Sequence, residues 1–129
     1  MNKVLLPLFG VLVCGVFGQS RNEHISVIVL LHSGLPNPTF DITEPQDIAD
    51  LEALSRDLPP AEERRWPTLC GFQLINHGVP QFPQELLLCR GVIRTFQGGT
   101  MAYFKDARGL EHWLVTQARK RGINLEAHE

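Results

Sequence analysis

The amino-acid sequence predicts an α+β fold, a small single sheet of three to four strands packed by two amphipathic helices in the order β-α-β-β-(β)-α. Apolar runs bounded by Gly and Pro indicate strands, and two segments carry apolar side chains at helical spacing. The chain has 129 residues, of which 43% are hydrophobic and 20% charged. That length suits one domain, in which the apolar helix faces cover one sheet.

Four segments read as strands. Residues 25–31 are apolar on both faces, which is typical of a strand in the middle of a sheet. Residues 70–75 form the second, closed by a turn at 76–78. Residues 86–96 read as one long third strand with Arg90 and Arg94 on its outer face, and residues 101–104 as a short fourth strand after the Gly-Gly turn.

The first helix is expected to begin at Thr43, because Thr43 and Gln46 match a capping box and Pro45 suits the first turn. The helix carries an apolar stripe and is stopped by the proline pair 59–60. The stripe consists of Ile48, Leu51, Leu54 and Leu58. Residues 61–67 then form a charged connector.

The last helix is expected to open at Asp106 as N-cap and to end at Gly122. Its apolar face consists of Leu110, Trp113, Leu114 and Ala118. Residues 123–129 are assigned to a flexible tail.

The first 18 residues read as a secretory signal peptide. Lys3 supplies one positive charge, an apolar run follows, and Val16 and Gly18 suit cleavage after Gly18. A signal anchor or a buried helix is the alternative. With cleavage, residues 19–24 form an N-terminal segment, residues 25–122 one α+β domain, and the protein is secreted.

Cleavage would remove Cys14 and leave Cys70 and Cys89. Two cysteines in an oxidising compartment favour one disulfide, with two buried free thiols as the alternative. Closing a loop of about 20 residues stabilises a fold by roughly 3 kcal/mol on the chain-entropy model.

The charge balance argues against two classes of partner. The formal net charge is −2 and the pI about 6.2. Nucleic acids and anionic membranes are negatively charged, so proteins that bind them usually carry a basic surface. We therefore expect no nucleic-acid partner and, after signal removal, no membrane partner.

No complete catalytic set is visible. Ser33 follows His32, but no G-x-S-x-G elbow surrounds it. The histidines and cysteines form no C-x-x-C or H-x-x-x-H pair, which argues against zinc. We therefore assign no catalytic residue, metal or cofactor.

Residues 71–80, G-F-Q-L-I-N-H-G-V-P, resemble the G-F-F-Q-L-x-N-H-G-V segment near the start of plant 2-oxoglutarate-dependent iron oxygenases. That resemblance implies an iron held by an H-x-D pair and a distant His. No histidine here has Asp two residues on, and the chain is too short for that family's double-stranded barrel. We therefore interpret this segment as a strand and turn.

Residues 33–40, S-G-L-P-N-P-T-F, resemble an S-G-x-P-N-P-x-[WF] signature of small uncharacterised proteins, with Phe40 where Trp is common. In those proteins a helix, a Gly-aromatic strand and a closing helix with a Trp-Leu pair follow. The resemblance spans about residues 25–118 and implies no activity.

These observations favour a secreted, non-enzymatic binding or interaction module for an extracellular protein or a small ligand. A rigid polar loop after a buried strand is a common binding device. Basic side chains near the third strand add a second candidate surface, which includes Lys105. The candidate binding residues are Ser33, Asn37, Thr39, Arg90 and Arg94. The alternatives are a small secreted hydrolase using Ser33 or a histidine, and a structural component of an extracellular matrix.

Overall fold

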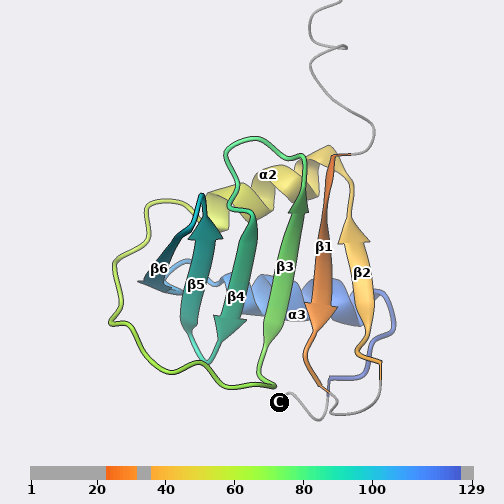
Figure 1. Cartoon of the computed structure of the whole chain (residues 1–129). Helices are drawn as coiled ribbons and strands as arrows, with labels where there is room; N and C mark the ends of the chain where they lie inside the picture. Colours follow the sequence, from red (N-terminus) through yellow and green to blue (C-terminus); the bar gives the residue numbers. More distant parts are fainter. Residues whose placement is uncertain (1–22, 32–35, 126–129) are drawn as a thin grey trace, which may run out of the picture.

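The computed structural model describes residues 23–31 and 36–125, and in these residues it contains six strands and two helices. The elements in chain order are β1 (His24–Val29), β2 (Thr39–Ile42), α2 (Pro45–Leu54), β3 (Phe72–His77), β4 (Glu85–Cys89), β5 (Val92–Gln97), β6 (Thr100–Lys105) and α3 (Leu110–Lys120). The strands form one sheet in the order β2-β1-β3-β4-β5-β6, antiparallel throughout (Figure 1). The predicted leader, residues 1–18, lies outside the described residues.

The prediction of three to four strands is wrong, because the sheet has six. One cause is the predicted third strand, which is a hairpin of β4 and β5. Its turn residues Arg90 and Gly91 have φ angles of 49° and 79°. Positive φ at both central residues is the geometry of a tight hairpin turn with the twist of the flanking strands. The sequence prediction missed this turn because Arg is an unusual residue at its first position.

The second cause is β2, a strand of only four residues. It pairs with β1, so that Val27 lies opposite Phe40 and Ile25 opposite Ile42. The sequence predicts a loop over residues 33–40, which includes Thr39 and Phe40 of this strand. Its alternating Thr-Phe-Asp-Ile pattern is that of a strand, but four residues are too few for a periodicity to stand out.

Helix α2 begins differently from the prediction. Its N-cap is Glu44, no side chain caps it, and Pro45 occupies the first turn. Gln46 donates to the Asp50 carboxylate at 3.0 Å instead of reaching back to Thr43, so the predicted capping box is absent. The helix ends at Leu54, and Leu58 lies beyond it.

Helix α3 begins at Leu110 with Gly109 as its N-cap, so the predicted N-cap, Asp106, lies three residues too early. Asp106 nevertheless caps it, because its carboxylate accepts the backbone N–H groups of Leu110 and Glu111 at 2.8 and 2.9 Å. The C-terminal end matches the prediction. Gly122 has a φ of 80°, and the N–H groups of Gly122 and Ile123 donate to Arg119 and Ala118, the pattern of a Schellman motif.

Both helices lie behind the sheet in Figure 1 and pack on the same face. This face holds the core, which includes residues from β1, β3, β4 and both helices. Its fully buried large side chains are Ile25, Val27, Val29, Ile42, Leu51, Phe72, Leu74, Leu86, Leu88, Ile93, Leu110 and Leu114. Within the segment predicted as a tail, Ile123 packs against the core and Leu125 is buried.

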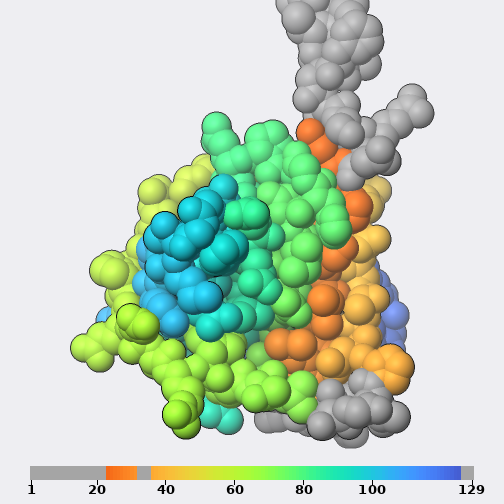
Figure 2. Space-filling view, in the orientation of Figure 1, coloured from red at the N-terminus to blue at the C-terminus, as the bar shows by residue number. Residues whose placement is uncertain are grey.

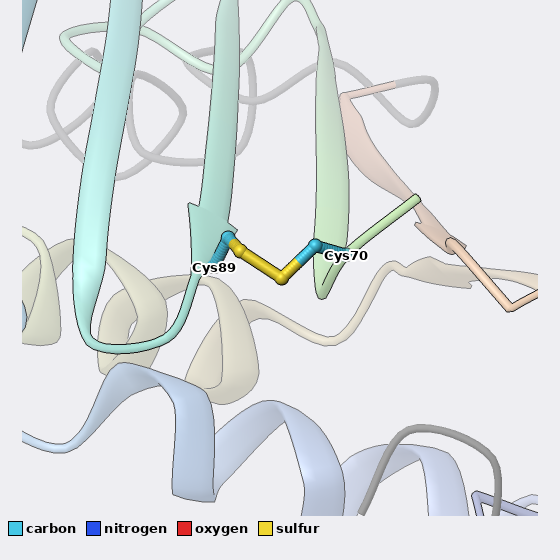
Figure 3. The surroundings of a disulfide bond; sticks show 2 residues. All are labelled: Cys70 and Cys89. Atoms are coloured by element: carbon cyan, nitrogen blue, oxygen red, sulfur yellow. A yellow bond between two sulfur atoms is a disulfide. The ribbon is translucent and has the colours of Figure 1, made fainter. Parts of the chain in front are cut away.

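The predicted disulfide is present. Cys70, just before β3, is bonded to Cys89 at the end of the neighbouring strand β4, with Cα atoms 5.4 Å apart (Figure 3). Gly71 next to it has a φ of 77°, and a Cβ atom there would lie 1.7 Å from the Leu88 carbonyl oxygen. Only glycine therefore allows the two strands to approach closely at the disulfide.

None of the helices in the described residues is long and apolar enough to cross a membrane.

Candidate functional site

The sheet face opposite the helices carries the candidate site, and we call it the outer face. Side chains alternate between the two faces along each strand. Two rows of cross-strand neighbours therefore cross the outer face from β2 to β6. One row consists of Thr39, Ile28, Gln73, Leu87, Arg94 and Tyr103, and the other of Asp41, Ser26, Ile75, Glu85, Phe96 and Met101. The aromatic members lie on β5 and β6, and the polar members on β2 and β1 are short.

Residues 61–69, which we call the strap, lie against this face at its β4–β6 end. Figure 2 shows their yellow-green atoms along the lower part of the viewed surface. The strap is first held to β6, where the Ala61 N–H donates to the Tyr103 carbonyl at 2.9 Å. It then places Trp66 beside Arg94, with the guanidinium carbon 5.2 Å from the centroid of the indole ring.

Trp66, Arg94 and Tyr103 form one cluster. The rings of Trp66 and Tyr103 are tilted by 50° with centroids 6.4 Å apart, and Arg94 lies directly opposite Tyr103 on the neighbouring strand. Tilted aromatic pairs and a guanidinium over an indole are both favourable arrangements. All three side chains are only partly buried.

A hollow of about 370 Å³ lies beside this cluster. Its lining mixes apolar, aromatic and charged groups and consists of Leu30, Trp66, Pro67, Thr68, Gln73, Glu85, Leu87 and Arg94. Gln73 donates to the Glu85 carboxylate, at 2.6 Å. The guanidinium of Arg94, the Gln73–Glu85 pair and the apolar side chain of Leu87 thus lie close together, and together they can contact a ligand that is both apolar and polar.

The indole N–H of Trp66 is buried and has no hydrogen-bond partner among the described residues. A buried donor without a partner costs about 1–3 kcal/mol, so most such groups are satisfied.

The structure describes four of the five predicted binding residues, and it does not gather these four into one site. Ser33 lies outside the described residues. The side chain of Asn37 is hydrogen-bonded to the backbone just after β1. Its oxygen accepts the N–H of Leu31 at 2.8 Å. Arg90 is exposed in the turn between β4 and β5.

Thr39 and Arg94 do share one row of the outer face, but they lie on β2 and β5 with β1, β3 and β4 between them. Four strand spacings of about 4.8 Å separate them, or about 19 Å. A ligand that touched both would have to cover most of the sheet. Arg94 is the predicted residue that belongs to the Trp66 cluster.

Trp66 and Tyr103 were missed as site residues. The sequence assigned residues 61–67 to a charged connector, and Tyr103 to a short strand. The available signal was the tryptophan itself, because a large aromatic residue inside a charged connector needs an apolar surface to pack against.

The described histidines do not form a metal site. His24 and His77 stack with ring centroids 4.4 Å apart at the ends of β1 and β3, and His112 is exposed on α3. In the described part of the chain, no group of three or more His, Cys, Asp or Glu side chains is placed to hold a metal ion. Ser33, the residue named for the alternative hydrolase, and the neighbouring His32 lie outside it.

Comparison of the chain with protein-family models, with curated proteins and with solved structures found no match. The chemistry of the outer face is therefore the basis for a functional inference.

Proposed function

We propose that this chain is a secreted, non-enzymatic binding module whose partner is an extracellular protein that docks on the outer face around Trp66, Arg94 and Tyr103. Secretion rests on the apolar leader in the sequence, and the Cys70–Cys89 disulfide suits an oxidising compartment.

The composition of the Trp66 cluster carries the proposal. Tryptophan, tyrosine and arginine are the residue types most enriched among the side chains that dominate binding energy at protein interfaces. Here all three lie together on a sheet face that neither helix covers. The exposed Met101 and the partly buried Phe96 lie opposite each other on the same face and extend its apolar area.

The size of the face favours a protein over a small molecule. Six strands at about 4.8 Å spacing make it about 24 Å wide. Stable protein interfaces bury about 800 Å² on each partner, whereas small ligands prefer concave sites that enclose most of their surface. The hollow beside Trp66 would then receive one side chain of the partner.

A site-specific photo-crosslinker tests which face the partner contacts. A photoreactive amino acid is placed at Met101 on the outer face or at the exposed Thr116 on α3, and the protein is incubated with the extracellular fluid in which it occurs. We expect a crosslinked product of defined mass from position 101 and none from position 116. Equal products from both positions would contradict the proposed face.

Substitutions within the cluster test the residues. With the crosslinker at Met101, the double variant Trp66→Ala, Arg94→Ala should lose at least nine-tenths of the product. The matched control Arg90→Ala removes a nearby exposed cation outside the cluster and should retain the product. A hydrolase would instead lose activity when Ser33 is substituted and be indifferent to Trp66.

A further inference from the structure

The two edges of the sheet differ in how their backbone groups are satisfied. The β6 edge is covered by the chain itself, because the Lys105 N–H donates to Pro59 at 2.8 Å and the Ala61 N–H donates to Tyr103. An isolated bridge joins Pro60 to Phe104 between these bonds. The other edge is β2, where no described residue pairs with the outward side (Figure 1).

The register identifies the groups that face outward from β2. The Val29 N–H donates to the Pro38 carbonyl, and residues two apart along an antiparallel strand face the same neighbour. Phe40 and Ile42 therefore direct their backbone groups toward β1. Thr39 and Asp41 direct theirs away from the sheet, and both residues are exposed.

Opposite charges flank this edge. On the helix side, the Arg121 guanidinium lies over the Phe40 ring, 4.6 Å from its centroid. On the outer face, the Asp41 carboxylate accepts the Ser26 hydroxyl at 2.9 Å. A strand added to β2 would meet a cation on one face of the sheet and an anion on the other.

We propose that β2 binds an extended peptide by antiparallel strand addition, and that this peptide carries an acidic residue between two hydroxyl or basic residues. The outward N–H and C=O groups of Thr39 and Asp41 supply the ladder hydrogen bonds. The acidic side chain lies opposite Phe40 and meets Arg121. The flanking side chains lie on the outer face, where one of them meets Asp41.

A second copy of this chain fits the edge less well than such a peptide. Two-fold pairing about Phe40 would place the Arg121 guanidiniums of both copies over adjacent Phe40 rings, and like charges oppose that approach. An acidic peptide replaces this repulsion by attraction. The inference is independent of the outer-face proposal, because it uses no residue of the Trp66 cluster.

Two capped synthetic peptides test it, Thr-Glu-Thr-Glu-Thr and Thr-Lys-Thr-Lys-Thr, titrated into the ¹⁵N-labelled chain. We expect the glutamate peptide to shift the amide signals of Thr39 and Asp41 and to bind at least tenfold more tightly than the lysine peptide. Shifts confined to the Trp66 cluster, or no shift at Thr39 and Asp41, would overturn the proposal.

Substitutions distinguish the contribution of the β2 backbone hydrogen bonds from that of the charge on Arg121. Thr39→Pro removes an outward N–H without removing a hydrogen bond to β1, so the variant should fold. Its affinity for the glutamate peptide should fall at least tenfold. The matched control Thr39→Ala keeps the N–H and should bind normally. Arg121→Gln should abolish the preference for glutamate over lysine. Full binding by a folded Thr39→Pro variant would overturn strand addition, and dimerisation through β2 would overturn the choice of partner. Trp66→Ala should leave the peptide shifts unchanged, which separates this test from that of the outer face.

Discussion

The two faces of the sheet are built from the same strands but differ in composition and in how far they are covered. Along β1, Ile25, Val27 and Val29 are fully buried beneath the helices, while the alternate residues are only partly buried. The helix-covered face is almost wholly apolar and closed. The outer face mixes aromatic, apolar and charged side chains and is only partly covered by the strap.

Under the proposed function, the helix-covered face provides stability and the outer face provides recognition. Alternation along a strand allows one set of positions to be optimised for packing and the other for contacts with a partner. Substitutions on the helix-covered face should therefore change the free energy of unfolding. Substitutions on the outer face should mainly change binding.

The largest expected effect is on the helix-covered face. Phe72→Ala deletes a fully buried ring and should lower the free energy of unfolding by about 3–5 kcal/mol, measured by urea denaturation. Phe96→Ala on the outer face is the matched control and should cost less than half as much, because Phe96 is only partly buried. Equal losses would remove the distinction between the two faces.

The second-largest effect on the free energy of unfolding is expected from loss of the disulfide. Replacing Cys70 and Cys89 together by Ala should lower the free energy of unfolding by roughly 3 kcal/mol, because the bond closes a loop between residues 19 apart. A reducing agent should destabilise the original protein to a similar degree and leave the double variant unaffected. A variant as stable as the original would show that packing of β3 on β4 suffices.

Substitutions of Asp106 test how much its hydrogen bonds to α3 contribute to the stability of the fold. Asp106→Ala removes both acceptors for the N–H groups of Leu110 and Glu111 and should cost about 1–2 kcal/mol, measured as a lower midpoint of thermal unfolding. Asp106→Asn keeps one oxygen acceptor and should cost less. The prediction fails if Ala and Asn are equally tolerated.

The smallest effect on stability is expected at Arg94. Arg94→Ala removes a partly exposed cation from the Trp66 ring and should cost less than about 1 kcal/mol. The same variant should markedly reduce crosslinking from position 101. A large loss of stability with unchanged crosslinking would reverse the roles assigned to the two faces.

Local patterns predicted much of the helix-covered face, the sheet and the disulfide. The stripes on both helices, the strands corresponding to β1, β3 and β6, and the Cys70–Cys89 pair all follow from residue type and spacing. The hairpin turn at Arg90 and the four-residue β2 were missed, since their conformations are imposed by neighbouring strands.

The candidate site was predicted less well, for a related reason. Arg94 could be placed near the outer face from strand alternation. Its contact with Trp66 joins residues far apart in the sequence through the irregular strap, and no local periodicity encodes such a contact. Asn37 was predicted to bind a ligand, but its side-chain oxygen accepts a hydrogen bond from the backbone N–H of Leu31.

The strand order also has a consequence for folding kinetics. Strands β3 to β6 follow one another as hairpins, so each pairing closes only a short loop. The pairing of Val29 with Phe72 instead joins segments separated by residues 30–71, including α2 and the strap. Distant contacts carry a larger entropic cost and slow folding. We therefore expect the four-strand meander to assemble first and the docking of the β1–β2 hairpin to limit the folding rate.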